Sequence, residues 1–149
     1  MKSKLDKIGS RFVQLTIGLI CASQTAKAGI VAMTILAEAR GEGPDGMAAV
    51  AACIYQRSLN RKITPEQVCI QPKQFSCWNG KTEADLAHLL KLPQAKTALW
   101  LEANLHRLNR AKIGYADHYH ADYVKPYWAD KSKKTFTIGK HIFYRLNAR

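Results

Sequence analysis

The sequence predicts an α+β fold in which several helices precede a small antiparallel sheet. Apolar residues recur at helical spacing over residues 31–111, whereas residues 115–123 alternate with a period of two and are rich in aromatic residues. Near the end of the chain, Gly139-Lys140 forms a two-residue loop with glycine first. Such loops are typical of type II′ turns, so we expect a hairpin of strands 135–138 and 141–145.

The helices are predicted from their start and stop signals. Val31 begins an apolar helix, which Gly41, Gly43 and Pro44 end. Asp45 is expected to cap a helix over 46–59, and the capping box Thr64-Pro65-Glu66-Gln67 opens a short helix that ends near Ile70. Thr82 is expected to cap a helix over 83–90. The longest expected helix is 93–111, which ends at Gly114 and has core residues Ala95, Leu99, Leu105 and Leu108. With no internal repeat or linker, the 149 residues predict one domain with one core.

One acid, Glu38, lies on the apolar stripe of the first helix, at helical spacing from Val31 and Ile35. A carboxylate on a buried face is costly unless it is paired, neutral or functional. Apolar surroundings and a helix C-terminus both favour the protonated acid, which is the form that a general acid needs. The alternative is a purely structural Glu38, bonded to Arg40, Arg57 or a loop amide.

Residues 1–28 have the pattern of a secretory signal peptide. The start is basic, Phe12 to Ala22 is an apolar run too short for an ordinary membrane span, and Ala26-Lys27-Ala28 is an A-x-A cleavage site. We therefore expect a mature domain of residues 29–149 that is secreted, to the periplasm or cell wall, with no stable membrane anchor. An uncleaved anchor is the alternative.

The four cysteines include Cys21, which leaves with the signal peptide. Cys69 and Cys77 flank a short loop, and this spacing could close a disulfide in an oxidising compartment. Cys53 lies among Ala and Val and is expected to be a small buried residue. Pairing of Cys53 with either of the other two stays open.

The net charge is +12, from 23 Lys and Arg against 11 Asp and Glu. A basic secreted domain suggests an anionic partner, such as the carboxylates and phosphates of a bacterial cell wall. The positive residues are scattered and no nucleic-acid motif occurs, so we expect no nucleic-acid partner.

Four blocks follow one another between about residues 31 and 146: Ala37-Glu-Ala-Arg-Gly-Glu42 with Gly46-Met-Ala-Ala-Val-Ala51, Gln74-Phe-Ser-Cys-Trp78, His118-Tyr-His-Ala121, and Ile138-Gly-Lys-His-Ile-Phe-Tyr144. In this order they resemble the cell wall hydrolase family of spore cortex-lytic enzymes (SleB-like). The resemblance implies a lysozyme-like or lytic-transglycosylase-like placement of the acid, peptidoglycan as the substrate and metal-free cleavage of its glycan strand. We expect a monomer without a cofactor.

Cleavage of a glycosidic bond needs an acid, for which Glu38 is the candidate, and a hydrolase usually adds a second carboxylate. Glu42 is the first candidate for that second group, followed by Asp45, Asp117 and Asp122. The positions of these four residues in the sequence do not single out one of them as the second carboxylate. An acid without a partner suits a lytic transglycosylase, in which the 6-hydroxyl of muramic acid attacks its own anomeric carbon, as the resemblance also implies. A muramidase-type hydrolase is the alternative.

Aromatic and polar side chains are candidates for holding the sugar. Pyranose faces stack on aromatic rings, although any single ring more often belongs to the core. The candidates are Gln74, Phe75, Ser76, Trp78, His118, Tyr119, His120 and Trp128, with Asn79 and Tyr127 beside them.

Two other classes of function compete with a glycan-cleaving enzyme. His118, His120 and His141 with a carboxylate could hold zinc, as in an amidase or peptidase, although no HExxH motif occurs. A non-catalytic wall-binding module would retain the cleft and lose the acid. The presence of Glu38 in its motif favours an enzyme.

Overall fold

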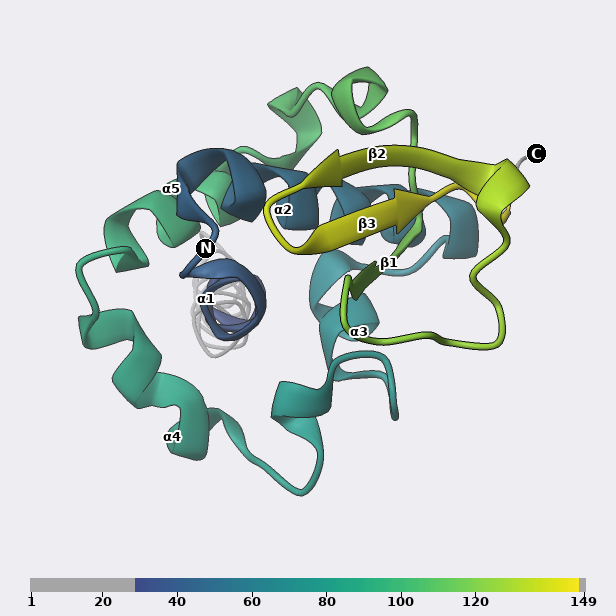
Figure 1. Cartoon of the computed structure of the whole chain (residues 1–149). Helices are drawn as coiled ribbons and strands as arrows, with labels where there is room; N and C mark the ends of the chain where they lie inside the picture. Colours follow the sequence, from purple (N-terminus) through teal and green to yellow (C-terminus); the bar gives the residue numbers. More distant parts are fainter. Residues whose placement is uncertain (1–28, 148–149) are drawn as a thin grey trace, which may run out of the picture.

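Helix α1 (Ile30–Ala39) is the central element of the fold. The computed structural model describes residues 29–147, and the predicted signal peptide lies outside the described residues. Helix α1 contacts α2 (Gly43–Arg61), α3 (Pro65–Ile70), α5 (Ala95–Ala103) and the 3₁₀ turn η3 (Ala87–Lys91). Figure 1 shows α1 end-on, with helices around it and the sheet on one side.

The sequence of α1 explains its central position. Its residues are apolar all round rather than on one face, and all except Ala37 and Glu38 are buried, as expected for a helix enclosed by other elements. Its first amides are bound by Glu102 of α5, whose Oε1 accepts from the N–H of Gly29 at 3.1 Å and of Val31 at 3.0 Å. A carboxylate satisfies these free donors and complements the helix dipole.

Most of the predicted helices are confirmed. Helix α2 begins at Gly43, earlier than predicted, so that Asp45 lies in its first turn instead of capping it. Its buried residues Ala49, Ala51 and Ala52 allow other elements to approach closely. The predicted capping box at Thr64 is formed at the start of α3, and Thr82 caps α4 (Glu83–Leu86) with a capping box of its own. Helix α4 is shorter than the predicted helix 83–90, because the chain continues as the 3₁₀ turn η3.

The predicted long helix 93–111 is wrong. Helix α5 ends at Ala103, because the Nδ2 of Asn104 donates to the carbonyl of Trp100 at 2.8 Å and competes with the helical ladder. The chain continues as two 3₁₀ turns, η4 (Leu105–Arg107) and η5 (Arg110–Ile113). Leu99, which was expected in the core, is 42% exposed.

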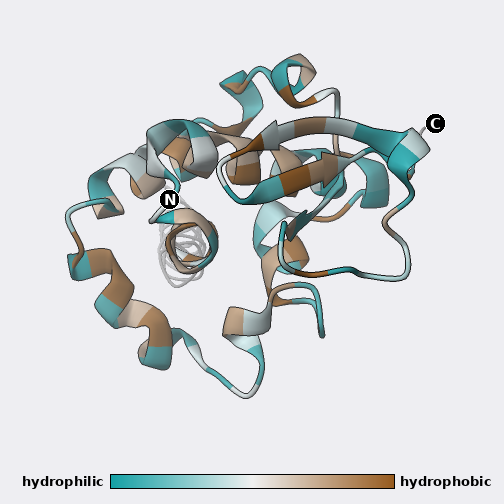
Figure 2. Cartoon of the chain, in the orientation of Figure 1, coloured by the Kyte–Doolittle hydropathy of each residue, from teal (hydrophilic) through white to brown (hydrophobic). Residues whose placement is uncertain are grey.

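The sheet consists of β1 (His118–Ala121), β2 (Lys134–Ile138) and β3 (His141–Tyr144), antiparallel in the order β1-β3-β2. The hairpin turn has Gly139 at a φ of 50°, as the first position of a type II′ turn requires. The predicted α+β fold is thus confirmed. Figure 2 shows hydrophobic residues on the helices around α1 and in the middle of β3.

The register of β1 and β3 determines which side chains share a face. Tyr119 pairs with Phe143 and Ala121 with His141, so these side chains lie on one face of the sheet. His118 and His120 lie on the opposite face. Among residues 29–147, no helix has the length and apolar character to cross a bilayer.

Candidate active site

Glu38 occupies the one part of α1 that is not enclosed. It is half-buried in the last turn, next to half-buried Ala37, while Ala39 after it is buried. The helix ends directly afterwards, where the Nη1 of Arg40 donates to the carbonyl of Leu36 at 3.1 Å. The carboxylate is therefore held by a rigid, buried helix and still faces outward.

Two hollows meet at Glu38. The larger, of about 460 Å³, extends over Arg57, Lys73 and the loop Gln74–Ser76. The smaller, of about 320 Å³, extends over Arg40, Gly41, Glu42 and Lys140. Both are lined by Ala37, Glu38, Ala121, Tyr123 and His141. A chain-like ligand that occupies both hollows would therefore cross the carboxylate of Glu38.

Tyr119 holds this carboxylate in place. Its hydroxyl donates to the Oε2 of Glu38 at 2.8 Å. Burial, and then the neighbouring Glu38, raise the pKa of Tyr119 well above its ordinary value, so the phenol stays protonated and remains a donor. Its ring lies edge-on to His141, with centroids 5.0 Å apart, and 5.3 Å from Phe143.

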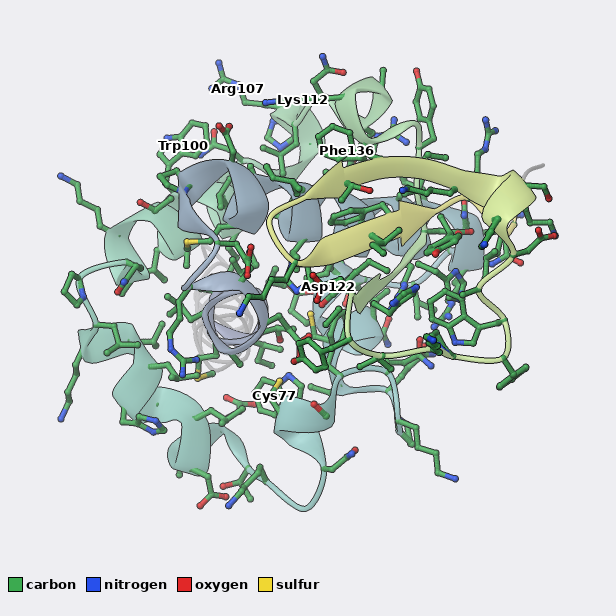
Figure 3. All side chains as sticks on the ribbon, in the orientation of Figure 1. Cys77, Trp100, Arg107, Lys112, Asp122 and Phe136 are labelled. Atoms are coloured by element: carbon green, nitrogen blue, oxygen red, sulfur yellow. The ribbon has the colours of Figure 1, made fainter. Side chains whose placement is uncertain are left out.

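The predicted Cys69–Cys77 disulfide is not formed, and Cys53 is also a free thiol. Cys69 is buried in α3, where burial raises the pKa of its thiol to about 12. Cys77 instead lies beside Glu38; burial, and then Glu38, raise the pKa of Cys77 to about 12. Figure 3 places Cys77 between the 3₁₀ turn η2 (Ser76–Trp78) and α1.

Glu42 connects the end of α1 to the β2–β3 hairpin. Its Oε2 accepts from the backbone N–H of Lys140 at 3.0 Å. A Cβ at Gly139 would lie 1.6 Å from the same oxygen, so only glycine permits this approach. The possible second carboxylate is therefore held in a structural contact, although it borders the smaller hollow.

The other candidate carboxylates lie outside the linings of both hollows. Asp45 pairs with Lys112 on the surface at 3.4 Å, and Asp122 is exposed. Asp117 is fully buried and accepts from Asn60, His118 and the amides of Leu146 and Asn147. Burial alone would raise the pKa of Asp117, but these hydrogen bonds outweigh it and hold the pKa below its usual range.

The candidate sugar-binding residues are divided by the structure. The larger hollow is lined by Gln74, Phe75, Ser76, Tyr119 and His120. Trp78 is instead packed against the core, where its Nε1 donates to the Oγ1 of Thr34 at 2.8 Å. The two further candidates, Asn79 and Tyr127, line neither hollow. Asn79 is exposed, and Tyr127 is fully exposed.

His118, His120 and Trp128 form an aromatic cluster with Tyr144 on the face of the sheet opposite Tyr119. Trp128 lies 5.3 Å from the ring of His118 and 5.7 Å from those of His120 and Tyr144. Both ring nitrogens of His120 have hydrogen-bond partners: Nε2 bonds to the hydroxyl of Tyr144 at 3.0 Å, and Nδ1 bonds to the carbonyl of Ala121 at 2.7 Å. His118 and Trp128 therefore do not face Glu38.

The zinc hypothesis does not fit this arrangement. His118 and His120 lie on one face of the sheet, whereas His141 lies on the other, against Tyr119. Three ligands on two faces cannot surround one ion. Among residues 29–147, no group of His, Cys, Asp and Glu is arranged to hold a metal.

The residues that sequence reasoning did not place in the cleft are Arg57, Lys73, Tyr123, Val124 and His141. His141 is 6% exposed, and its Nδ1 is the buried side-chain atom without a partner among the described residues. Burial lowers the pKa of His141 more than Glu42, Glu38 and Asp122 raise it, so the ring is neutral. The hairpin signal predicted its strand, but the register that turns His141 toward Glu38 needed the structure.

An acid held by a tyrosine at the meeting point of two hollows is a suitable site for an enzyme that acts on an extended substrate. The family model described as Cell Wall Hydrolase matches residues 41–144. The chain therefore belongs to the cell wall hydrolase family and is an enzyme that degrades peptidoglycan. No curated protein and no solved structure matches the chain. Glu38 lies just before the matched range, so its role rests on the geometry.

Proposed function

We propose that the protein cleaves the MurNAc–GlcNAc glycan strand as a lytic transglycosylase, with Glu38 as general acid and then base. The position of Glu38, shared by both hollows and bonded to Tyr119, is the observation that supports this most directly. The bond to be cleaved would lie over Glu38, with sugars on both sides.

In this mechanism Glu38 donates its proton to the leaving glycosidic oxygen. The 6-hydroxyl of the same muramic acid attacks the anomeric carbon, and the Glu38 carboxylate accepts the hydroxyl proton. The products are a new 4-hydroxyl end and a 1,6-anhydro end, and no water is consumed. This attack is intramolecular and depends on orientation more than on a strong base, which agrees with the commitment of Glu42 to Lys140.

A muramidase-type hydrolase is the second candidate, because Glu42 does border the smaller hollow that Glu38 shares. Digestion of purified peptidoglycan in ¹⁸O water, followed by mass spectrometry of the released muropeptides, distinguishes the two. We expect unlabelled 1,6-anhydro ends. Reducing muramic acid ends that carry ¹⁸O would establish hydrolysis, with Glu42 as the first candidate for the second carboxylate.

Turbidity loss of purified cell walls tests the remaining alternatives. Clearing that persists with a chelator argues against a zinc amidase or peptidase, and clearing of any kind argues against a wall-binding module. The proposed substrate lies outside the cytoplasm, so the function requires export. Secretion through residues 1–28 and action as a monomer stay predictions.

A further inference from the structure

Arg57 of α2 is a buried cation without a carboxylate partner. Its exposed fraction is 5%, and it lines the larger hollow together with Glu38. The ion pairs among residues 29–147 are Lys112–Asp45 and His118–Asp117, and neither includes Arg57. Arginines are rarely this buried unless they are paired, so the guanidinium lacks its usual counter-charge.

The hydrogen bonds of Arg57 leave one nitrogen of its guanidinium, Nη2, without a partner among residues 29–147. Its Nε donates to the backbone carbonyl of Asp117, and its Nη1 reaches the Oε1 of Gln74 at 3.5 Å. The group also lies over the ring of Phe75, 5.3 Å from its centroid. Nη2 has no partner among the described residues. Among the fully buried side-chain atoms of the described residues, His141 Nδ1 is the one without a partner. Nη2 of Arg57 is therefore not fully buried, and it opens on the hollow that Arg57 lines.

The acids nearest to Arg57 do not neutralise it. The carboxylate of Asp117 accepts from His118, Asn60 and two backbone amides, and only its backbone carbonyl turns to Arg57. Glu38 accepts from Tyr119. Lys73, exposed at the edge of the same hollow, adds a second positive charge. This end of the cleft is therefore positive and offers a planar donor group.

We propose that Arg57 binds a carboxylate of the glycan substrate in the larger hollow, an inference that rests on the proposed function. A guanidinium matches a carboxylate in geometry and charge. Two parts of peptidoglycan carry this group: the lactyl substituent of muramic acid once its peptide has been removed, and the stem peptide. Either would hold the sugar in register with Glu38.

The test measures binding by the Glu38→Gln variant, which separates recognition from turnover. The ligands are peptide-bearing strands and peptide-free strands, each untreated and after conversion of carboxylates to methylamides. We expect amidation to raise the Kd about ten- to hundredfold, as for loss of a hydrogen bond to a charged group. The strand type that shows this rise identifies the lactyl or the peptide as the source.

Arginine variants then assign the effect. In Glu38→Gln/Arg57→Gln, the difference between untreated and amidated strands should disappear. Arg110→Gln is the matched control, because Arg110 also bonds to a glutamine, Gln56, and lies over an aromatic ring, Tyr55, but away from the cleft. In the Arg110 control the full difference should persist.

The outcomes are separable. Equal binding of untreated and amidated strands by Glu38→Gln overturns the role of Arg57 and leaves the proposed function standing. An absence of binding to every strand overturns both. The comparison of untreated with amidated strands uses no arginine variant. It therefore tests the role of the carboxylate even if Arg57→Gln misfolds.

Discussion

The two faces of strand β1 differ in how completely their polar groups are satisfied. On one face, Tyr119 holds the half-buried Glu38, and His141 beside it has an unpartnered Nδ1. On the other face, His120 uses both ring nitrogens, and the Nδ1 of His118 bonds to Asp117 at 2.9 Å. Residues one position apart in the sequence thus differ: Tyr119 contacts the candidate acid, whereas the rings of His118 and His120 bond within the protein, although His120 also borders the larger hollow.

This difference shows that residue type is a weak guide to role in the His118-Tyr119-His120 block. Histidines are the usual candidates for proton transfer or metal binding, yet here both bond within the protein. The tyrosine, which looks like a packing residue, contacts the acid. We infer that the face with incompletely satisfied groups is the one available to a ligand.

The most severe change on the cleft face is Glu38→Gln. Glutamine preserves the size and still accepts from Tyr119, but it cannot protonate the leaving oxygen. We expect normal folding and a loss of about 10²–10⁴-fold in the rate of peptidoglycan digestion. Glu42→Gln, which retains an acceptor for Lys140, is the comparison and should lose less. A Glu38→Gln variant with more than a tenth of the wild-type rate would exclude Glu38 as the general acid.

On the opposite face, Asp117→Asn should change stability rather than chemistry. The amide replaces one acceptor by a donor, which opposes either the N–H of Leu146 at Oδ1 or that of Asn147 at Oδ2, at a cost of about 2–4 kcal/mol in the free energy of unfolding. Chemical denaturation measures this. A loss of activity without a loss of stability would place Asp117 in the cleft function.

The same variant tests the pH dependence. The pKa of Asp117 is lower in the folded protein than the unfolded value of about 3.9. The carboxylate therefore contributes stability above that value, and this contribution is lost as the pH falls through the folded pKa. Wild-type stability should fall in acid below about pH 4, and the dependence should be shallower in Asp117→Asn.

Tyr119→Phe tests how much the positioning of Glu38 matters. It removes one hydrogen bond to the carboxylate and preserves the ring that packs on Phe143 and His141. We expect kcat/KM to fall about tenfold, the value of one hydrogen bond to a charged group. An unchanged kcat/KM would show that α1 alone positions the acid.

The smallest effect is expected from Tyr144→Phe, the matched change on the other face. It removes the bond to the Nε2 of His120 and should lower the free energy of unfolding by about 1 kcal/mol. Activity should stay within about twofold of wild type. A larger loss than that of Tyr119→Phe would reverse the assignment of the two faces.

The parts of the fold with local signals could be predicted from the sequence. The capping box at Thr64, the cap at Thr82, the Gly139-Lys140 turn and the apolar run of α1 each depend on neighbouring residues, and all are formed. The prediction of a long helix over 93–111 was wrong because the side chain of Asn104 bonds to a backbone carbonyl. The residues around Asn104 favour a helix, so the local sequence did not indicate this break.

Of the candidate site, only the central residue, Glu38, could be placed from the sequence. The position of Glu38 at an open helix end follows from spacing and from the glycines after it. The partners of Glu38 depend on contacts distant in sequence, such as that with Tyr119, and on the register of β1 against β3. The separate environments of Cys69 and Cys77, and the opening of Arg57 on the cleft, are likewise tertiary properties without a local pattern.

The contact of Glu42 with the hairpin tip restricts how these segments can vary. A Cβ at Gly139 would meet the carboxylate of Glu42, and a Cβ at Gly46 would lie 2.4 Å from the Cβ of Glu42. Alanine at position 46 should thus be tolerated only together with glycine at position 42, which has no Cβ, whereas alanine at position 139 would in addition be strained by the positive φ. Positions 42 and 46 are therefore expected to covary in any library of this sequence that is selected for folding, and position 139 is expected to remain glycine.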